Sequence, residues 1–200
     1  MAIISLTEAK LYIGNTSAVD DTLLTALLLA AQAFIEGPQA AQRLYEAAAD
    51  TTRSFDAACD VDGRLLYLDH DLCAITSITN GDGQLITSGQ YVCETAGGER
   101  NKTPWRRIRL RQTATVSWLP SATTGPENAI SIVGKWAYST TAPERIKQLM
   151  REVVAYEYRR RSASGDMDRP IIADGVTILP SALPKGIMLQ LMAERMESSL

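Results

Sequence analysis

The chain has 200 residues, of which 46% are apolar and 22% are charged, and its formal net charge is −3. These values are typical of a globular chain with one core or two small ones, and they exclude disordered, collagen-like and coiled-coil architectures. The longest run without charged or turn-forming residues, residues 23–35, is shorter than the roughly 18 to 20 residues that cross a bilayer. Glu8 lies where a secretory signal would carry basic residues. We therefore expect a cytoplasmic protein with no membrane segment.

Charge is distributed unevenly between the two halves of the chain. Residues 1–100 contain 14 acidic and 5 basic side chains, whereas residues 101–200 contain 9 acidic and 15 basic ones. Such asymmetry is consistent with a basic face for nucleic acid, and equally with an acidic patch on one copy that meets a basic patch on the next. The charge pattern alone leaves both alternatives open.

Two helices are predicted at the start of the chain. The first begins at Ser5 and Glu8, which have the spacing of a capping box, and it ends at Gly14. The second begins at residues 20–21 and ends at residues 37–38. The second helix is apolar on nearly every side, so it must be covered by more than one neighbour, either in its own fold or in another subunit. A third, weaker helix is expected over residues 39–48.

The pattern changes to antiparallel β-strands from Thr51 to about Pro126. Residues 80–83, Asn-Gly-Asp-Gly, predict a tight hairpin turn between strands at residues 72–79 and 84–92. Residues 69–71, Asp-His-Asp, are expected to form a polar turn. In the strand at residues 105–111, alternation places Arg106, Ile108 and Leu110 on one face and Trp105, Arg107, Arg109 and Arg111 on the other.

The last part of the chain predicts one more strand and a long helix, followed by a separate segment. Residues 129–138 form the strand, in which Gly134 indicates a bulge or a close backbone approach. The helix begins after Thr140 or Thr141, has Pro143 in its first turn, and ends in the arginines of residues 159–161. A polar linker covers residues 162–168. A short strand at residues 176–179 and a helix at residues 183–196 are expected beyond it.

These elements predict an α+β fold with a helical core, an inserted antiparallel β region and a C-terminal helical arm. The expected boundaries are residues 1–50 and 128–163 for the helical core, 51–127 for the β subdomain and 164–200 for the arm.

The inventory of chemically active side chains is poor. His70 is the one histidine of the chain, and Cys59, Cys73 and Cys93 are too widely spaced for a usual zinc site. The acidic pairs Asp60 with Asp62 and Asp166 with Asp168 lie in turn-rich stretches without the spacing of a calcium loop. No phosphate-binding glycine loop is present. We therefore predict no catalytic residue, metal or cofactor, and a protein that is not an enzyme.

Two basic clusters could form contacts. The basic strand, Arg106, Arg107, Arg109 and Arg111, could follow a nucleic-acid backbone, although pairing with acidic neighbours on a solvated face is favoured. Tyrosines and arginines also gather toward the end of the long helix. Because these residue types are enriched at protein interfaces, a subunit contact is the preferred functional interpretation there.

The order of these segments resembles the head-tail connector (adaptor) proteins of long-tailed bacteriophages. The resemblance lies in ISLTEAKLYIG and DDTLLTALLLAAQAFIE near the start and in ISIVGKWAYSTTAPERIKQL and AYEYRRR later in the chain. The β insert with LYLDHDLCAITSITNGDGQLI resembles the longer members of that family. The resemblance implies a non-enzymatic homo-oligomeric ring of about twelve copies. Such a ring lies in the virion neck between the portal protein and a tail-completion or terminator protein, is assembled in the host cytoplasm, and lets DNA pass without sequence-specific binding.

The resemblance also suggests which residues make contacts. The predicted subunit interface comprises apolar, aromatic and arginine side chains of the helical core: Leu24, Leu27, Leu28, Phe34, Trp136, Tyr138, Tyr156, Tyr158, Arg159, Arg160 and Arg161. The predicted portal-binding arm comprises Ile171, Ile172, Leu183, Ile187 and Leu191. The alternatives are a tail-completion or tail-terminator ring protein, and a nucleic-acid-binding module that uses the basic strand.

Overall fold

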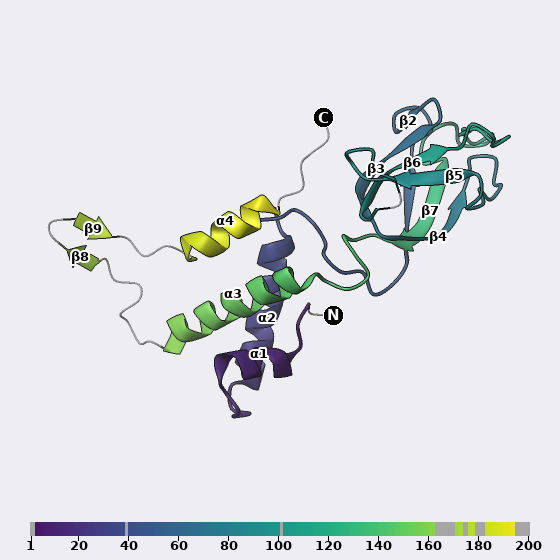
Figure 1. Cartoon of the computed structure of the whole chain (residues 1–200). Helices are drawn as coiled ribbons and strands as arrows, with labels where there is room; N and C mark the ends of the chain where they lie inside the picture. Colours follow the sequence, from purple (N-terminus) through teal and green to yellow (C-terminus); the bar gives the residue numbers. More distant parts are fainter. Residues whose placement is uncertain are drawn as a thin grey trace. The chain divides into compact units, whose positions relative to one another are not determined.

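The chain divides into two compact units (Figure 1). In the computed structural model, the described residues are 3–38, 40–100, 102–162, 171–173, 176–178 and 183–194. The helical unit lies within Met1–Gln42 and Pro143–Ser198, and the β unit is Arg43–Ala142. The α+β class is therefore as predicted, with helices and strands segregated into different units.

The helical unit contains α1 (Leu6–Ile13), α2 (Asp21–Glu36), α3 (Glu144–Ser162) and α4 (Lys185–Ala193). The predicted capping box of α1 is present, because the Ser5 amide donates to the Glu8 carboxylate at 2.7 Å and the Glu8 amide donates to the Ser5 hydroxyl at 3.2 Å. The first of these hydrogen bonds also lowers the pKa of Glu8. Gly14 ends α1 in the left-handed conformation, with φ of 79°.

One face of α2 packs inside the helical unit. Helices α1, α2 and α3 contact one another, and α4 contacts α3. The buried positions of α2 are spaced by three and four residues, which places them on one side of the helix. They are Leu24, Leu28, Ala31 and Ile35. Facing residues of α3, including Ile146, Met150 and Val154, are fully buried as well.

The predicted third helix over residues 39–48 is wrong for the residues described there, 40–48, none of which is helical. The chain closes on itself after α2, because the Ala41 amide donates to the Ile35 carbonyl at 3.1 Å and the Gln42 amide to the Gly37 carbonyl at 3.1 Å. Gln42 then adopts a φ of 53°, a left-handed conformation that does not continue a helix.

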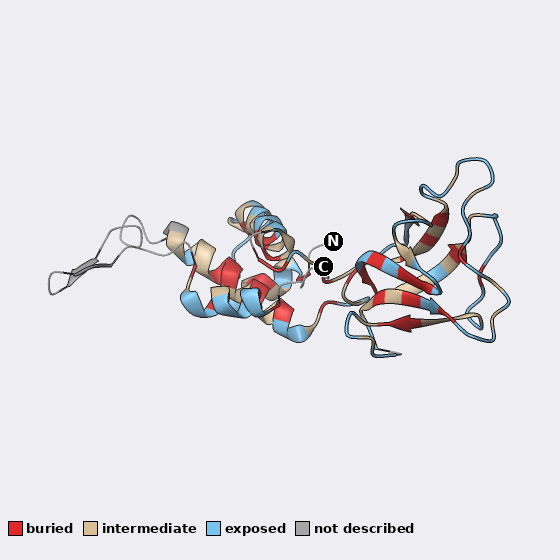
Figure 2. Cartoon of the chain, turned by 90° about the horizontal axis from the view of Figure 1, so that it is seen from above, coloured by how far each residue is buried: buried red, intermediate tan, exposed pale blue. Residues whose placement is uncertain are grey.

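The β unit contains two antiparallel sheets, ordered β1-β7-β4 and β2-β3-β6-β5. Its strands are β1 (Thr51–Phe55), β2 (Val61–Asp62), β3 (Leu65–Leu72), β4 (Ala74–Thr79), β5 (Tyr91–Glu94), β6 (Trp105–Leu110) and β7 (Ile130–Lys135). Both sheets contribute to one buried apolar cluster, with Leu66 and Ile108 from the larger sheet and Ile78 and Ile132 from the smaller. Figure 2 shows buried stretches along the strands of the β unit.

Strand β7 forms the centre of the smaller sheet, between β1 and β4. Residues 43–50 and 128–142, which the sequence assigns to the helical core, therefore belong to the β unit. The reason is pairing between residues far apart in the chain, such as Thr52 with Val133. Gly134 makes the predicted close approach, because a Cβ at this position would lie 2.2 Å from the carbonyl oxygen of Ala74.

Two further expectations for the β region are corrected. Residues 78–86 do form a tight turn, with the Ile86 amide donating to the Ile78 carbonyl at 2.9 Å. However, β4 pairs with β7 and β5 pairs with β6, so the turn does not join two long partner strands. The Asp-His-Asp triplet at residues 69–71 lies within β3, where the pairing register with β6 shifts, and it is not a turn between strands.

A separate two-stranded sheet follows α3 in the sequence. It consists of β8 (Ile171–Ala173) and β9 (Val176–Ile178), which pair only with each other among the described strands. The strand predicted at residues 176–179 is thus present.

Substitution of Gly134 tests the close packing of the smaller sheet. We expect Gly134→Val to destabilise the chain by about 3 kcal/mol, because the added carbons overlap backbone atoms that cannot move independently. Urea denaturation followed by fluorescence measures this change. Gly89→Ala is the matched control, since a Cβ there meets nothing within 4 Å, and an equal loss in both variants would contradict the packing argument.

Candidate interaction surfaces

The outward face of α2 is largely apolar, with the exposed Thr22 and Thr25 among its residues. Ala26, Leu29, Ala30 and Ala33 are exposed on it, and Leu29 is 60% exposed. That α2 must be covered by more than one neighbour stays a prediction, because the described fold leaves this side of the helix exposed. Its own unit covers only one side of the helix, which leaves aliphatic area that is stabilised by burial against a partner.

The predicted interface residues of α2 fall into two groups. Leu24 and Leu28 are buried inside the helical unit, which corrects their assignment to a subunit contact. Leu27 and Phe34 are half-buried and line a groove of about 430 Å³. The groove also receives Val153 from α3, and Leu183 and Met188 from the α4 region. The ion pair between Glu157 and Arg160, at 3.8 Å, lies at the same groove.

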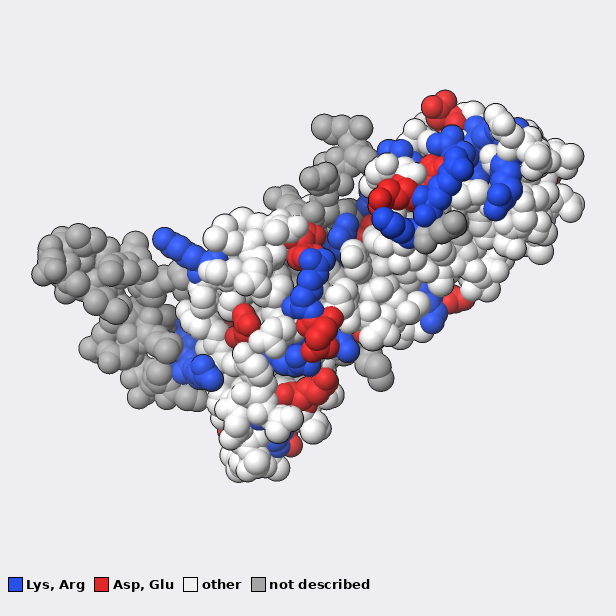
Figure 3. Space-filling model, in the orientation of Figure 1, with Lys and Arg blue, Asp and Glu red and all other residues white. Residues whose placement is uncertain are grey.

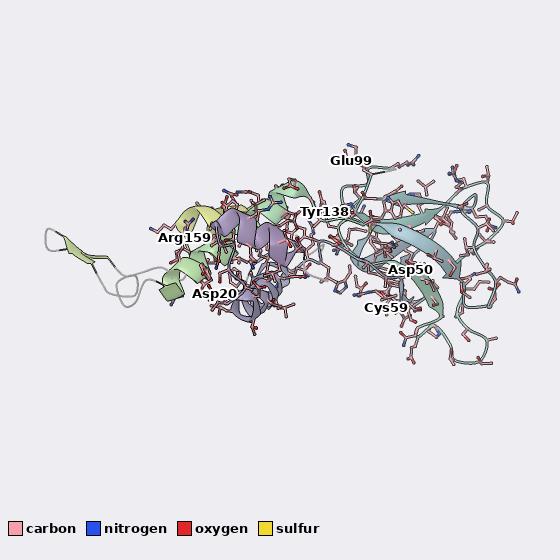
Figure 4. All side chains as sticks on the ribbon, turned by 90° about the horizontal axis from the view of Figure 1, so that it is seen from below. Asp20, Asp50, Cys59, Glu99, Tyr138 and Arg159 are labelled. Atoms are coloured by element: carbon pink, nitrogen blue, oxygen red, sulfur yellow. The ribbon has the colours of Figure 1, made fainter. Side chains whose placement is uncertain are left out.

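The tyrosines of α3 have different surroundings. The Tyr158 hydroxyl donates to the Asp20 carboxylate at 2.7 Å and accepts from the Asn15 amide at 2.9 Å, so it ties α3 to the α1–α2 connection. The hydrogen bond to Asp20 raises the pKa of Tyr158. Tyr156 and Arg159 line a second groove, of about 400 Å³, between α3 and α4. Figure 4 labels Asp20 and Arg159 on the helical unit.

Two other predicted interface residues, Trp136 and Tyr138, lie in the β unit. Trp136 is 3% exposed, and its indole nitrogen donates to the Thr51 carbonyl at 3.0 Å, so it belongs to the β core and not to an interface. Tyr138 is half-buried and packs against Arg43, whose guanidinium carbon lies 5.1 Å from the ring centroid. The side chain of Arg161 lies outside the described residues.

Helix α4 differs from the predicted free arm. Leu183, Ile187 and Leu191 are buried, and Arg145 of α3 forms an ion pair with Glu194 at the end of α4. These apolar side chains are therefore largely covered by the chain itself, so α4 is packed on its own unit and is not a free arm. Only the backbone of Ile171 and Ile172 is described, in β8.

The basic strand divides between core and surface. Arg106 is 9% exposed and its guanidinium lies 3.7 Å from the buried carboxylate of Asp71, which Arg43 approaches at 2.6 Å. The assignment of Arg106 to a nucleic-acid face is thus corrected, because its side chain points to the interior with Ile108 and Leu110. The predicted alternation along β6 is confirmed.

The other arginines of β6 lie toward the outside. The Arg109 guanidinium donates two hydrogen bonds to the Glu94 carboxylate, of 2.9 and 3.1 Å. The guanidinium carbon of Arg107 lies 5.5 Å from the ring centroid of Tyr67. The hydrogen bond from Arg109 lowers the pKa of Glu94. Figure 3 shows lysines and arginines gathered on this face of the β unit, with acidic side chains among them.

The chemically active side chains do not converge in the described structure. His70 is about half-exposed, with Nδ1 2.7 Å from the Arg53 guanidinium and 2.9 Å from Asp69. Burial raises the pKa of Cys93 to about 12, and Cys73 is buried too, whereas Cys59 is exposed. The Asp60 carboxylate accepts a hydrogen bond of 2.7 Å from the Asp56 backbone amide. Asp166 and Asp168 lie outside the described residues. Within the described ranges, no group of three or more His, Cys, Asp or Glu could hold a metal.

These features define an α+β protein of two units with apolar and basic surfaces. Where the chain is described, no helix combines the length and apolarity needed to cross a membrane. No protein-family model and no curated protein matches the sequence.

Solved structures of gene transfer agent particles contain chains with a similar fold. One match is in "Virion of native gene transfer agent (GTA) particle", at 18% identity and a TM-score of 0.56, covering 99% of this chain and 92% of the other. A second is in "Neck of empty GTA particle computed with C6 symmetry", at 17% identity, a TM-score of 0.56 and the same coverage of both chains. A third is in "Neck of native GTA particle computed with C12 symmetry", at 17% identity and a TM-score of 0.53, covering 98% of this chain and 90% of the other. Nearly the whole length of the chain therefore has a fold similar to that of chains in gene transfer agent particles, two of them in reconstructions of the neck.

Asp71 offers a test of the buried charge cluster. We expect Asp71→Asn to destabilise the chain by about 3 kcal/mol, because it leaves two largely buried guanidinium groups without their shared carboxylate. Thermal unfolding compared with Asp69→Asn, whose carboxylate is 53% exposed, provides the measurement and control. A loss equal to that of the control would show that the cluster contributes nothing.

Proposed function

We propose that the chain is a structural, non-catalytic subunit of a ring in the neck of a phage-like particle. The proposed ring lies between the portal and the tail, and DNA passes through its centre. The single observation that carries the proposal is the match of nearly the whole chain, 98 to 99% of it, to chains of gene transfer agent particles, two of them in reconstructions of the neck. The match extends through both units, so it supports a role for the complete chain.

The uncovered face of α2 supports assembly by the helical unit. A ring is built from heterologous contacts, in which two different faces of each copy meet. The apolar face of α2 supplies one such face, and Leu27 and Phe34 continue it into the groove. The matched necks were computed with C6 and C12 symmetry. A ring of twelve copies is compatible with both, and we propose this number here.

The proposed portal contact is the segment between α3 and α4. Since α4 packs against α3 within its own unit, we do not assign the portal contact to α4, as the sequence suggested. We assign it to the segment that contains β8 and β9. A hairpin with no third strand gains stability when a partner covers it.

The alternative is a tail-completion or terminator ring. It would use the same apolar face for assembly but would contact the tail tube and not the portal. The proposed portal contact therefore separates the adaptor role from this alternative.

Leu29 provides the test of ring assembly. We expect Leu29→Asp to prevent ring formation while leaving the fold intact, because a carboxylate on the apolar face must be desolvated when copies meet. Native mass spectrometry measures assembly and circular dichroism measures folding. Leu85→Asp is the matched control, because Leu85 is 64% exposed in the β unit. Rings formed by both variants would exclude the α2 face as the contact.

Replacement of residues 167–180 by a glycine-serine linker tests the portal contact. The linker leaves α3 and α4 unchanged, so we expect a variant that still forms rings but no longer sediments with portal assemblies. Co-sedimentation of the unaltered chain is the control. Undiminished portal binding by the linker variant would overturn the assignment, and binding to tail tubes by both forms would favour the terminator role.

A further inference from the structure

The β unit contains a cavity of about 510 Å³ that is lined by Arg64, Arg100, Arg109 and Arg111. We call these four residues and their cavity the arginine pocket. Gln112 and Thr113 add two polar side chains to its lining. Glu94, next to the pocket, accepts two hydrogen bonds from Arg109 and lies 3.5 Å from Arg100. It is the one carboxylate within 4 Å of a pocket guanidinium among the described residues, so positive charge is in clear excess.

The pocket cations are positioned by the fold. The Arg64 guanidinium donates to the backbone carbonyls of Leu110 at 3.3 Å and Ala114 at 2.9 Å, and also to that of Arg111. Because carbonyl groups carry no net charge, these bonds orient Arg64 without neutralising it. Glu94 similarly orients Arg109 while its own side chain stays buried. Side chains that are ordered before binding lose less entropy when a ligand arrives.

We propose that the arginine pocket binds phosphate groups of a DNA backbone without reading base sequence. Guanidinium groups present paired N–H donors that match the oxygens of phosphate. Protein partners are disfavoured, because stable protein interfaces have an apolar centre, whereas the pocket has Val92 and the buried Leu110 as its apolar lining residues. Interfaces with DNA are more polar and more positively charged than interfaces between proteins.

Sequence reasoning places only part of this pocket. Arg109 and Arg111 belong to the predicted basic strand, but Arg64 and Arg100 come from other segments, before β3 and after β5. They converge because β3 and β5 pair with β6 on its two sides. In a ring, which rests on the proposed function, each copy would contribute one pocket, so that weak contacts add along the DNA. The pocket itself does not depend on the ring.

The test is the affinity of the full chain for a labelled DNA duplex of random sequence, measured by fluorescence anisotropy at several salt concentrations. The pocket variant is Arg64→Gln combined with Arg111→Gln, which spares the Arg109–Glu94 pair. We expect it to weaken binding about ten-fold at low salt and to reduce the slope of log K against log salt by about two, one for each lost phosphate contact.

Lys135→Gln combined with Lys147→Gln is the matched control, because it removes the same charge outside the pocket lining. This control should keep the affinity within about two-fold of the unaltered chain. Circular dichroism confirms that both variants fold. Inorganic phosphate should compete with the duplex better than chloride at equal ionic strength.

Three results would overturn the proposal. The first is that the unaltered chain does not bind the duplex at low salt. The second is that the pocket variant and the control lose equal affinity for the duplex. The third is that the chain binds polyglutamate through the pocket but does not bind DNA, which would assign the pocket to an acidic protein. Native mass spectrometry of the pocket variant separates this inference from the proposed function. Normal rings with unchanged DNA affinity would refute the pocket alone, whereas the absence of rings from the unaltered chain would refute the ring.

Discussion

The arrangement of the helical unit depends on covering α2, a helix that is apolar on nearly every side. The chain itself covers one side, where Leu24, Leu28 and Ile35 are buried against neighbouring helices. The opposite side, which includes the exposed Leu29, remains in contact with water. Removing apolar area from water stabilises an assembly by about 25 cal/mol per Å². A chain with this unbalanced helix is therefore suited to associate, and the proposed ring follows from that constraint.

The β unit is stabilised independently of this apolar face. Its two sheets enclose one apolar cluster, and a buried carboxylate, Asp71, is held by Arg43 at the start of the unit. The entering and leaving segments also meet, because the Tyr138 amide donates to the Leu44 carbonyl at 2.8 Å. The unit can thus be an insertion that carries its own surface, separate from the helical unit to which we assign ring assembly. The arginine pocket gives that surface a chemistry different from the apolar face of α2.

Patterns among residues close together in the sequence predicted local structure correctly. They did not predict which strands pair when the strands lie far apart in the chain. The capping box of Ser5 and Glu8 and the close approach at Gly134 depend on a few neighbouring residues or on one residue type, and both are present. The boundary of the β unit was misplaced because the residues of β7 pair with residues 52 to 83 positions earlier in the chain. The interface residues were chosen by type and not by burial, so Leu24 and Trp136 were assigned to surfaces although both lie in cores. Arg64 carries no local signal, since its role arises from strand pairing.

Electron microscopy of particles that contain this chain measures the central claim most directly. The account predicts density for the chain as a closed ring of twelve copies in the neck, with the outward face of α2 buried between adjacent copies and one end of the ring against the portal. A chain found as a single copy, or a ring in which Leu29 faces solvent and the helical units do not touch, would contradict it.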